Sequence, residues 1–178
     1  MTVALVSFTL VLLIIAWRHS AVPWRHRWRR RQARAMAEQL RGSDREQSPA
    51  MIFARLRAMD ALAFEELLLE SFERQGHTVV RNCRYTGDGG IDGQVVLAGE
   101  RWLVQAKRYA GPIKPAHVVA FAELCRTRRQ RGLFIHTGRT GPASRAACRT
   151  GDVVIISGRA LLALIRGERL DLIDRAGR

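Results

Sequence analysis

Apolar residues recur at helical spacing between residues 48 and 76, and short apolar runs separated by glycine-rich turns follow them. Spacings of three and four residues place side chains on one face of a helix, whereas short apolar runs between turns are typical of strands. Ser48 before Pro49 marks the start of the helix, and Gly76 marks its end. Asp60 is also a good capping residue, so the pattern allows a break in the helix there.

Three strands are expected after this helix, at residues 77–81, 94–97 and 101–107. Residues 98–100 join the second and third strands as a hairpin. Side chains alternate across a strand, so Gln105 and Lys107 share one face of the third strand. Val104 and Ala106 take the opposite face. The two polar side chains are therefore expected at the edge of an apolar core.

The C-terminal half of the chain alternates helices with strands. The pattern predicts a helix at 116–131, a strand at 133–137, a helix at 140–148, a strand at 153–157 and a helix at 159–166. The last strand is almost wholly apolar, as expected for a strand that is covered on both faces. The complete order of elements predicts a three-layer α/β fold, in which helices flank a mixed sheet.

Residues 2–17 form an almost unbroken apolar run, and an arginine-rich stretch follows it. This run is slightly shorter than the roughly 17–25 residues of a usual spanning helix, but Trp17 and the long side chain of Arg18 extend it into the interface. A cleaved signal peptide is the competing interpretation. We favour an anchor because no positive charge precedes the run and no clear cleavage site follows it.

The predicted organisation is a transmembrane anchor at residues 1–17, a basic juxtamembrane linker at 18–47 and a folded domain at 48–170. Arginines directly after an apolar segment stay on the cytoplasmic side of a membrane. We therefore expect a single-pass protein of the bacterial inner membrane with its domain in the cytoplasm. The arginines of the linker could serve as topology determinants only, or could also contact lipid headgroups or DNA.

The composition favours a polyanionic partner. The formal net charge is +14, which suits either nucleic acid or an anionic membrane surface. Lys107 and Lys114 are the only lysines among the 30 basic residues. A lysine at position 107 in so arginine-rich a chain indicates a need for a compact ammonium group. The three cysteines lack metal-ligand spacing, so we interpret them as small apolar residues in a reducing compartment.

The hairpin brings together side chains that could perform hydrolysis. It folds the end of the 101–107 strand back beside Asp92, so that a carboxylate, the Gln105 amide and the Lys107 ammonium converge. Asp92 and Gln105 supply the hard oxygen ligands that Mg²⁺ prefers, and Lys107 would face a phosphate or the attacking water. The alternative is a surface hairpin whose polar side chains are only solvated.

Three short stretches in order resemble the motifs of the Mrr-type restriction endonuclease domain. They are Phe64-Glu65, residues 88–92 (DGGID) and residues 104–107 (VQAK). That domain belongs to the PD-(D/E)xK nuclease superfamily, here with Gln in place of the usual acid. The resemblance covers roughly residues 55–165. It implies a restriction-endonuclease-like fold, a Mg²⁺ or Mn²⁺ cofactor, DNA as substrate, and Glu65 as an additional acid facing the metal.

Other residues are candidates for supporting roles. We expect DNA-phosphate contacts from Arg108, Lys114, Arg139 and Arg145, although solvated loops would carry the same charges. His136 could act as a general base, but a lone histidine at a strand end is more often structural. Asp88 could be a second carboxylate of the site, but beside two glycines an Asx-turn is the favoured interpretation.

The sequence thus predicts a Mg²⁺-dependent DNA endonuclease tethered to the inner membrane, as a monomer or a homodimer. Asp92 and Gln105 would ligate the metal, with Glu65 near it and Lys107 acting on water. One alternative is a non-catalytic membrane-anchored protein that binds nucleic acid. Another is a structural accessory of a DNA-transfer assembly. The family resemblance does not imply dependence on DNA modification, because a separate recognition domain is lacking in these 178 residues.

Overall fold

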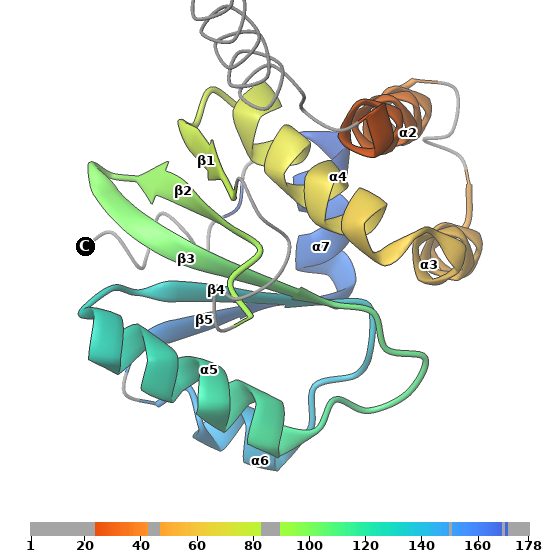
Figure 1. The fold of residues 1–178 in the computed structure, drawn as a ribbon. Helices are drawn as coiled ribbons and strands as arrows, with labels where there is room; N and C mark the ends of the chain where they lie inside the picture. The colour runs from red at the N-terminus through yellow and green to blue at the C-terminus, as the bar shows by residue number, and fades with distance from the viewer. Residues whose placement is uncertain (1–23, 43–46, 83–89, 150, 169, 171–178) are drawn as a thin grey trace, which may run out of the picture.

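A computed structural model describes residues 24–42, 47–82, 90–149, 151–168 and 170. Within these residues the chain forms a five-stranded mixed sheet with helices on both faces (Figure 1). The predicted mixed sheet flanked by helices is therefore confirmed. All five predicted strands are present, and each begins and ends within two residues of its expected bounds.

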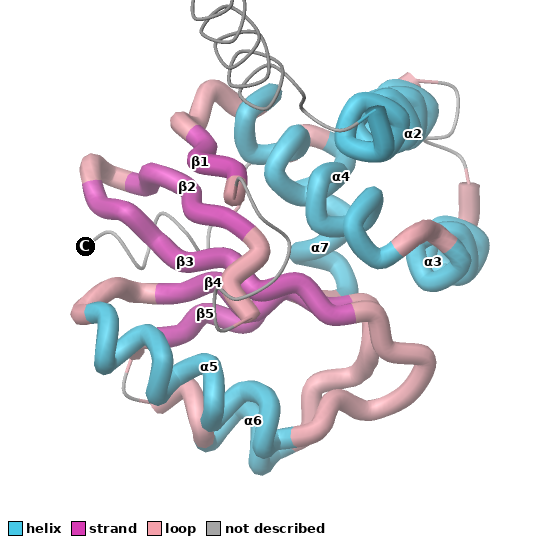
Figure 2. The backbone as a smooth tube through the Cα atoms, in the orientation of Figure 1, coloured by secondary structure: helices cyan, strands magenta, loops and turns pink. Residues whose placement is uncertain are grey.

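The strands follow one another across the sheet in sequence order, and their directions divide the sheet in two. They are β1 Val79–Arg81, β2 Gly93–Leu97, β3 Glu100–Lys107, β4 Gly132–His136 and β5 Val153–Ile156. The pairs β1–β2 and β2–β3 are antiparallel, whereas β3–β4 and β4–β5 are parallel (Figure 2). The strand β3 thus joins the hairpin half of the sheet to the crossover half.

The predicted hairpin between β2 and β3 has a two-residue turn. Leu97 pairs with Glu100, and the two residues between them have positive φ angles, 49° for Ala98 and 83° for Gly99. Two successive positive φ angles are the mark of a type I′ turn, whose twist matches that of the flanking strands. The turn fixes the register that places Gly93 opposite Val104, and the functional site depends on this register.

The helices form one layer on each side of the sheet. They are α2 Trp24–Arg41, α3 Pro49–Ala58, α4 Ala61–Arg74, α5 Pro115–Arg128, α6 Pro142–Ala146 and α7 Gly158–Arg166. One face of the sheet is covered by α4 and α7, with α2 packed outside them, and the other by α5 with α6 (Figure 1). Alternation along β3 divides its side chains between the two layers. Trp102 enters the core under α4, and Leu103 enters the core under α5.

The expected break in the first long helix occurs at Asp60. Its Oδ1 atom accepts hydrogen bonds of 3.1 Å from the backbone N–H groups of Leu62 and Ala63, so Asp60 is the N-cap of α4. Ser48 caps α3 in the same way, by accepting from the backbone N–H of Met51. These two caps separate the predicted helix into α3 and α4 and determine where α4 begins.

The helix α2 was not expected, because the sequence analysis interpreted residues 18–47 as a linker. Ala33, Ala37 and Leu40 lie on one face of α2 and are buried in the same core as the apolar residues of α4 and α7. Their spacing of four and three residues is that of a helix face. The many arginines of residues 18–47 favoured the interpretation of a basic linker, and the apolar stripe is too short to predict a packed helix.

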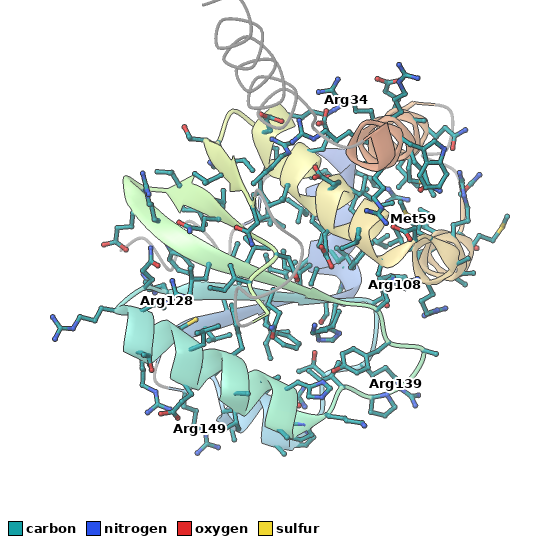
Figure 3. The ribbon with its side chains drawn as sticks, viewed as in Figure 1. Arg34, Met59, Arg108, Arg128, Arg139 and Arg149 are labelled. Carbon is teal, nitrogen blue, oxygen red and sulfur yellow. The ribbon has the colours of Figure 1, made fainter. Side chains whose placement is uncertain are left out.

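Three arginines of α2 pair with acids at and within α4. Arg29 contacts Asp60 at 3.2 Å, Arg30 contacts Glu66 at 3.7 Å and Arg34 contacts Glu70 at 3.4 Å. Glu66 and Glu70 are buried, so these pairs are screened less by solvent than pairs on an open surface. Figure 3 labels Arg34 on the outer layer that α2 forms. These arginines therefore contribute to holding α2 on the domain.

The helix α5 is shorter than predicted. It ends at Arg128, and Arg129 adopts the left-handed conformation at its C-cap. Arg131, which was expected in the last turn of the helix, instead places its guanidinium 4.3 Å from the centre of the Trp102 ring. A residue with positive φ breaks the repeating hydrogen bonds of a helix, and this break brings the chain into β4.

No helix in the part of the chain that the structure describes is both long and apolar enough to cross a membrane. The predicted anchor at residues 1–17 lies outside the described residues, and so do residues 18–23 and 43–46 of the predicted linker. The anchor therefore stays a prediction.

The packing of α2 gives a first testable prediction. Replacing the buried Leu40 by Ala leaves a cavity between α2 and the core, so the free energy of unfolding should fall by about 2–4 kcal/mol. Met51, which is 56% exposed on α3, is the matched control, and Met51→Ala should change stability by less than about 0.5 kcal/mol. Chemical denaturation of both variants measures the difference. Equal stabilities would show that α2 does not pack as described.

Candidate active site

The polar residues predicted to act together lie where β2 begins and β3 ends. The backbone N–H of Asp92 donates to the carbonyl of Val104 at 2.8 Å, which continues the β2–β3 ladder by one residue. The side chain of Asp92 then accepts a 2.6 Å hydrogen bond at Oδ2 from the backbone N–H of Ala106. Because Ala106 stands between Gln105 and Lys107, this bond places the carboxylate beside both of them. The structure thus attaches the Asp92 side chain to the strand that carries Gln105 and Lys107, and the joint role of the three stays a prediction.

Burial disfavours the ionised form of the Asp92 carboxyl. Desolvation raises its pKa from 3.8 to about 6, although the bond from Ala106 and the charge of Lys107 act in the opposite direction. A carboxylate that is desolvated in this way is stabilised by any further positive charge placed near it. The site therefore favours a cation next to Asp92.

Glu65 reaches the same site from α4. Burial is the largest cause that raises its pKa, from 4.5 to about 8, and the charge of Asp92 raises it further. Lys107 opposes these effects. The charges of both Asp92 and Lys107 therefore affect the pKa of Glu65. Such proximity is expected for the acid that the family resemblance places at the metal. The Asp60 cap sets its position, because it fixes where α4 begins.

Gln105 is held in one orientation by the glycine turn before β2. Its Nε2 atom donates a 2.7 Å hydrogen bond to the carbonyl of Gly90, and only 8% of the residue is exposed. With the amide nitrogen engaged, the amide oxygen is the atom left to act as a ligand. Gly90 has a φ of 86°, and a Cβ atom there would lie 2.7 Å from Nε2. A side chain at position 90 would therefore displace Gln105.

A cleft of about 350 Å³ opens on the α5 side of these residues. It is lined by Gln105, Lys107, His117, Ala120 and Phe121. Gln105 and Lys107 line it because both point to the α5 face of β3, as predicted. Glu65 comes from the opposite helical layer, so the two layers meet at the end of β3. Lys107 acts electrostatically on both acids and also lines the cleft, and it therefore connects the two sides of the site.

Arg108, predicted to contact DNA, is engaged by the protein. Its Nη1 atom donates to the backbone carbonyl of Arg57 at 2.9 Å and also to that of Met59. Figure 3 shows Arg108 and Met59 facing each other across the α3–α4 junction. Arg108 directly follows Lys107, so these hydrogen bonds connect the end of β3 to the residues that lead into α4. This contact supports the relative position of Lys107 and Glu65.

The other three residues predicted to contact DNA are exposed. Lys114 is the N-cap of α5, and Arg139 lies in the loop after β4. The two loops are joined because Arg139 exchanges backbone hydrogen bonds with Gly111 and Ile113, at 3.1 and 3.0 Å. Arg145 donates to the carbonyl of Thr140 at 2.8 Å. The joined loops place Lys114 and Arg139 in one region of the surface, while their DNA contacts stay a prediction.

His136 has no nitrogen available for catalysis. It is fully buried, and its Nδ1 atom accepts a 3.1 Å hydrogen bond from the backbone N–H of Gly138. Its Nε2 atom contacts the Thr140 hydroxyl at 3.0 Å, and that hydroxyl contacts Ser157 at 3.1 Å. Burial lowers the pKa of His136 to about 4, so the ring is neutral at physiological pH. The structural interpretation of this histidine therefore agrees with the packing.

The donor atoms at the site fit a hard divalent cation. No group of three or more His, Cys, Asp or Glu residues that could hold a metal occurs among the residues the structure describes. The set here is two carboxylates, Glu65 and Asp92, with an amide oxygen from Gln105. These are the oxygen ligands that Mg²⁺ and Mn²⁺ prefer. Burial is the largest cause of the raised pKa of both acids, so a bound cation would stabilise their ionised forms. Asp88 lies outside the described residues.

Two residues at or beside the cleft were missed by the sequence analysis. His117 lines the cleft, and the phenol oxygen of Tyr109 contacts Nδ1 of His117. A weak signal was present, because both lie close to the end of β3 and the start of α5. Their contact joins a loop to a helix, and periodicity alone does not predict such contacts.

The comparisons with known proteins agree with this geometry. The family model for the Mrr catalytic domain, described as a restriction endonuclease, matches residues 56–165. The matched segment contains Glu65, Asp92, Gln105 and Lys107. No curated protein and no solved structure matches the chain. Because the matched residues form more than half of the chain and include the whole candidate site, the protein belongs to the restriction endonuclease family of the Mrr catalytic domain.

Proposed function

We propose that this restriction-endonuclease-like nuclease is a metal-dependent DNA endonuclease that hydrolyses phosphodiester bonds. The observation that carries the proposal is the grouping of two desolvated carboxyl groups around one lysine at the end of β3. A structural hairpin would gain nothing from burying Glu65 and Asp92 without ion-pairing them fully. A nuclease needs this arrangement, because a divalent cation and a phosphate are to be bound there.

The residues divide the work of hydrolysis between them. Asp92 and Gln105 would hold Mg²⁺ or Mn²⁺, and Glu65 would bind it directly or through a water. When bound, the cation activates water and accepts charge from the scissile phosphate. Asp92 is oriented for this role by Ala106, and Gln105 by Gly90.

Lys107 would act on the reacting atoms rather than on the ion. Its ammonium group donates hydrogen bonds, so it can orient the attacking water and stabilise negative charge that develops on the phosphate. Its place on β3 lets it face the cleft while it remains within the electrostatic reach of Glu65 and Asp92. Lys114, Arg139 and Arg145 would contact phosphates outside the cleft, and Arg108 would add a further contact while it supports the α3–α4 junction.

We also propose that the enzyme is attached to the cytoplasmic face of the bacterial inner membrane. The support is the apolar run at residues 2–17 followed by clustered arginines. The helix α2 contains most of these arginines and packs on the domain, so little chain would separate an anchor from the nuclease. A homodimer is a further prediction that follows from the nuclease assignment alone.

The metal ligands give the second prediction. Asp92→Ala removes a charged ligand, so Mg²⁺ should no longer support plasmid nicking, while DNA binding persists or tightens because a carboxylate that repels phosphate is gone. Gln105→Glu restores the acid usual in the superfamily, so this variant should keep activity and shift the metal preference. Nicking with Mg²⁺, Mn²⁺, Ca²⁺ or EDTA measures both. Mg²⁺-dependent nicking by Asp92→Ala would show that the assigned site is wrong and would favour a non-catalytic tether.

Lys107 gives the third prediction. Lys107→Ala should bind metal almost normally and yet lose detectable turnover, because the ammonium acts on water and on charge in the transition state. Lys107→Arg should be nearly as inactive, since the planar guanidinium is bulkier and cannot approach in the same way. Single-turnover cleavage with saturating Mg²⁺ separates this loss from a loss of metal. Cleavage by Lys107→Arg at the wild-type rate would contradict the assigned role.

The raised pKa of Glu65 gives the fourth prediction. The pKa of Glu65 is about 8 in the folded protein and 4.5 for a free glutamate, so the unfolded chain releases this proton at a much lower pH. Stability in EDTA therefore decreases as pH rises between these values, and Glu65→Gln should remove that loss. The Tm of Glu65→Gln should exceed the wild-type Tm by an amount that grows from about pH 5 to about pH 8.5.

Glu73 provides a control of opposite sign. The hydrogen bond from Arg81 lowers the pKa of Glu73, so its carboxylate contributes stability that is present at neutral pH and lost in acid. Glu73→Gln should therefore lower the Tm at high pH, with a smaller effect near pH 4. If Glu65→Gln and Glu73→Gln shift the Tm in the same direction at high pH, the buried charge at Glu65 has been assigned wrongly.

The membrane attachment gives the fifth prediction. An uncleaved anchor with its C-terminal side in the cytoplasm should make a C-terminal alkaline phosphatase fusion inactive, and a fluorescent protein fusion should glow at the membrane. Cell fractionation and mass spectrometry of the N-terminus complete the measurement. Strong phosphatase activity, or a mature protein that lacks residues 1–21, would contradict the anchor without bearing on the nuclease site.

A further inference from the structure

His117 lines the same cleft as Gln105 and Lys107. It lies in the first turn of α5, and its side chain is exposed. The Nδ1 atom contacts the hydroxyl of Tyr109, and the two rings lie 6.0 Å apart between centroids. The imidazole is therefore held from one side by the protein, and Nε2 is the nitrogen left for another partner.

Tyr109 is itself fixed in place, so the contact is not that of two loose surface residues. Its backbone N–H donates to the Thr137 hydroxyl at 2.9 Å, and that hydroxyl donates to its carbonyl at 3.0 Å. Gly138 lets the loops approach closely, because a Cβ there would lie 2.6 Å from the Tyr109 Cβ and 2.4 Å from the Gly111 carbonyl oxygen. The end of β4 thus positions Tyr109, and Tyr109 positions His117.

The hydrogen bonds of the Tyr109 hydroxyl determine which nitrogen of His117 carries the proton. Burial raises the pKa of Tyr109, although the backbone of Lys114 acts in the opposite direction, so the phenol keeps its own proton. The hydroxyl lies against Nδ1 of His117. When this O–H donates to Nδ1, the neutral imidazole carries its hydrogen on Nε2 and presents an N–H donor to the cleft.

The surroundings of this donor are suited to an anion. The Lys107 ammonium lines the same cleft, and the first turn of a helix carries partial positive charge. A metal ion is a poor partner, because a nitrogen that bears a proton cannot ligate it and Nδ1 is already engaged. Phosphate oxygens are acceptors only, so they complement a set of donors.

We propose that Nε2–H of His117 donates a hydrogen bond to a phosphate oxygen of the DNA strand that lies in the cleft, and so positions that strand against Lys107. The inference rests on the proposed function, because it gives the cleft its phosphodiester. It assigns substrate binding to His117, and it makes Tyr109 a positioning residue that acts through His117.

The test compares five variants of the full chain, one of them a control, in two assays. Steady-state cleavage of a fluorescein-labelled duplex of mixed sequence, with Mg²⁺, gives KM and kcat. Fluorescence anisotropy with the same duplex gives Kd in the Asp92→Ala background, where cleavage is absent. His117→Ala should raise KM and Kd about tenfold, the loss expected for a hydrogen bond to a charged group, and change kcat by less than about threefold.

The remaining variants separate a donor from a merely structural residue. His117→Gln should keep KM within about threefold, because its amide nitrogen can take the place of Nε2, whereas His117→Asn should behave like His117→Ala. Tyr109→Phe keeps the ring but loses the O–H, so it should raise KM several-fold. Val119→Ala, at an exposed position on the same helix, is the control and should match the wild type.

The possible outcomes distinguish this inference from the proposed function. Wild-type KM and Kd in His117→Ala would overturn the inference, and so would a loss in His117→Gln as large as in His117→Ala. If the wild-type protein does not cleave DNA, the proposed function fails and anisotropy alone decides. Weaker duplex binding by His117→Ala would then support the contact, and unchanged binding would remove it.

Discussion

The site depends on one hydrogen bond, from the backbone N–H of Ala106 to the carboxylate of Asp92. Asp92 precedes β2 and would otherwise be a turn residue with a free side chain. The bond attaches its carboxylate to the neighbouring strand between Gln105 and Lys107. The register of the hairpin makes this attachment available, since Gly93 pairs with Val104. A slip of one residue would turn Gln105 and Lys107 into the core under α4 and leave Asp92 alone.

The same arrangement places two carboxyl groups where the protein alone does not favour their ionisation. Lys107 lowers the pKa of both Glu65 and Asp92, yet burial keeps both values well above those of free carboxyl groups, and the charge of Asp92 raises the pKa of Glu65 further. One ammonium cannot satisfy two buried carboxylates. The fold therefore maintains a site that is less stable when ionised than when protonated, and a divalent cation would remove that penalty. Active sites typically lower the stability of the folded protein in this way.

The parts of this structure that follow from local pattern could be predicted, and the parts that follow from distant contacts could not. Alternation along residues 101–107 gave the faces of Gln105 and Lys107, because each depends only on the period of a strand. The helix α2 was missed because its apolar stripe is three small or medium residues among arginines, and its stability comes from packing on α4. The position of His117 likewise depends on a contact with Tyr109 that no spacing encodes.

The arginine content takes a different meaning once these contacts are known. A net charge of +14 implies a uniformly basic surface, but several arginines are paired with acids on the side of α4 that faces α2. Arg81 alone contacts Glu66 at 3.0 Å and Glu73 at 2.7 Å. Such pairs hold elements together and contribute little to the field that a polyanion would sense. The basic side chains outside these pairs therefore carry the charge that a polyanion would sense, and Lys107 brings part of it into the cleft that His117 also lines.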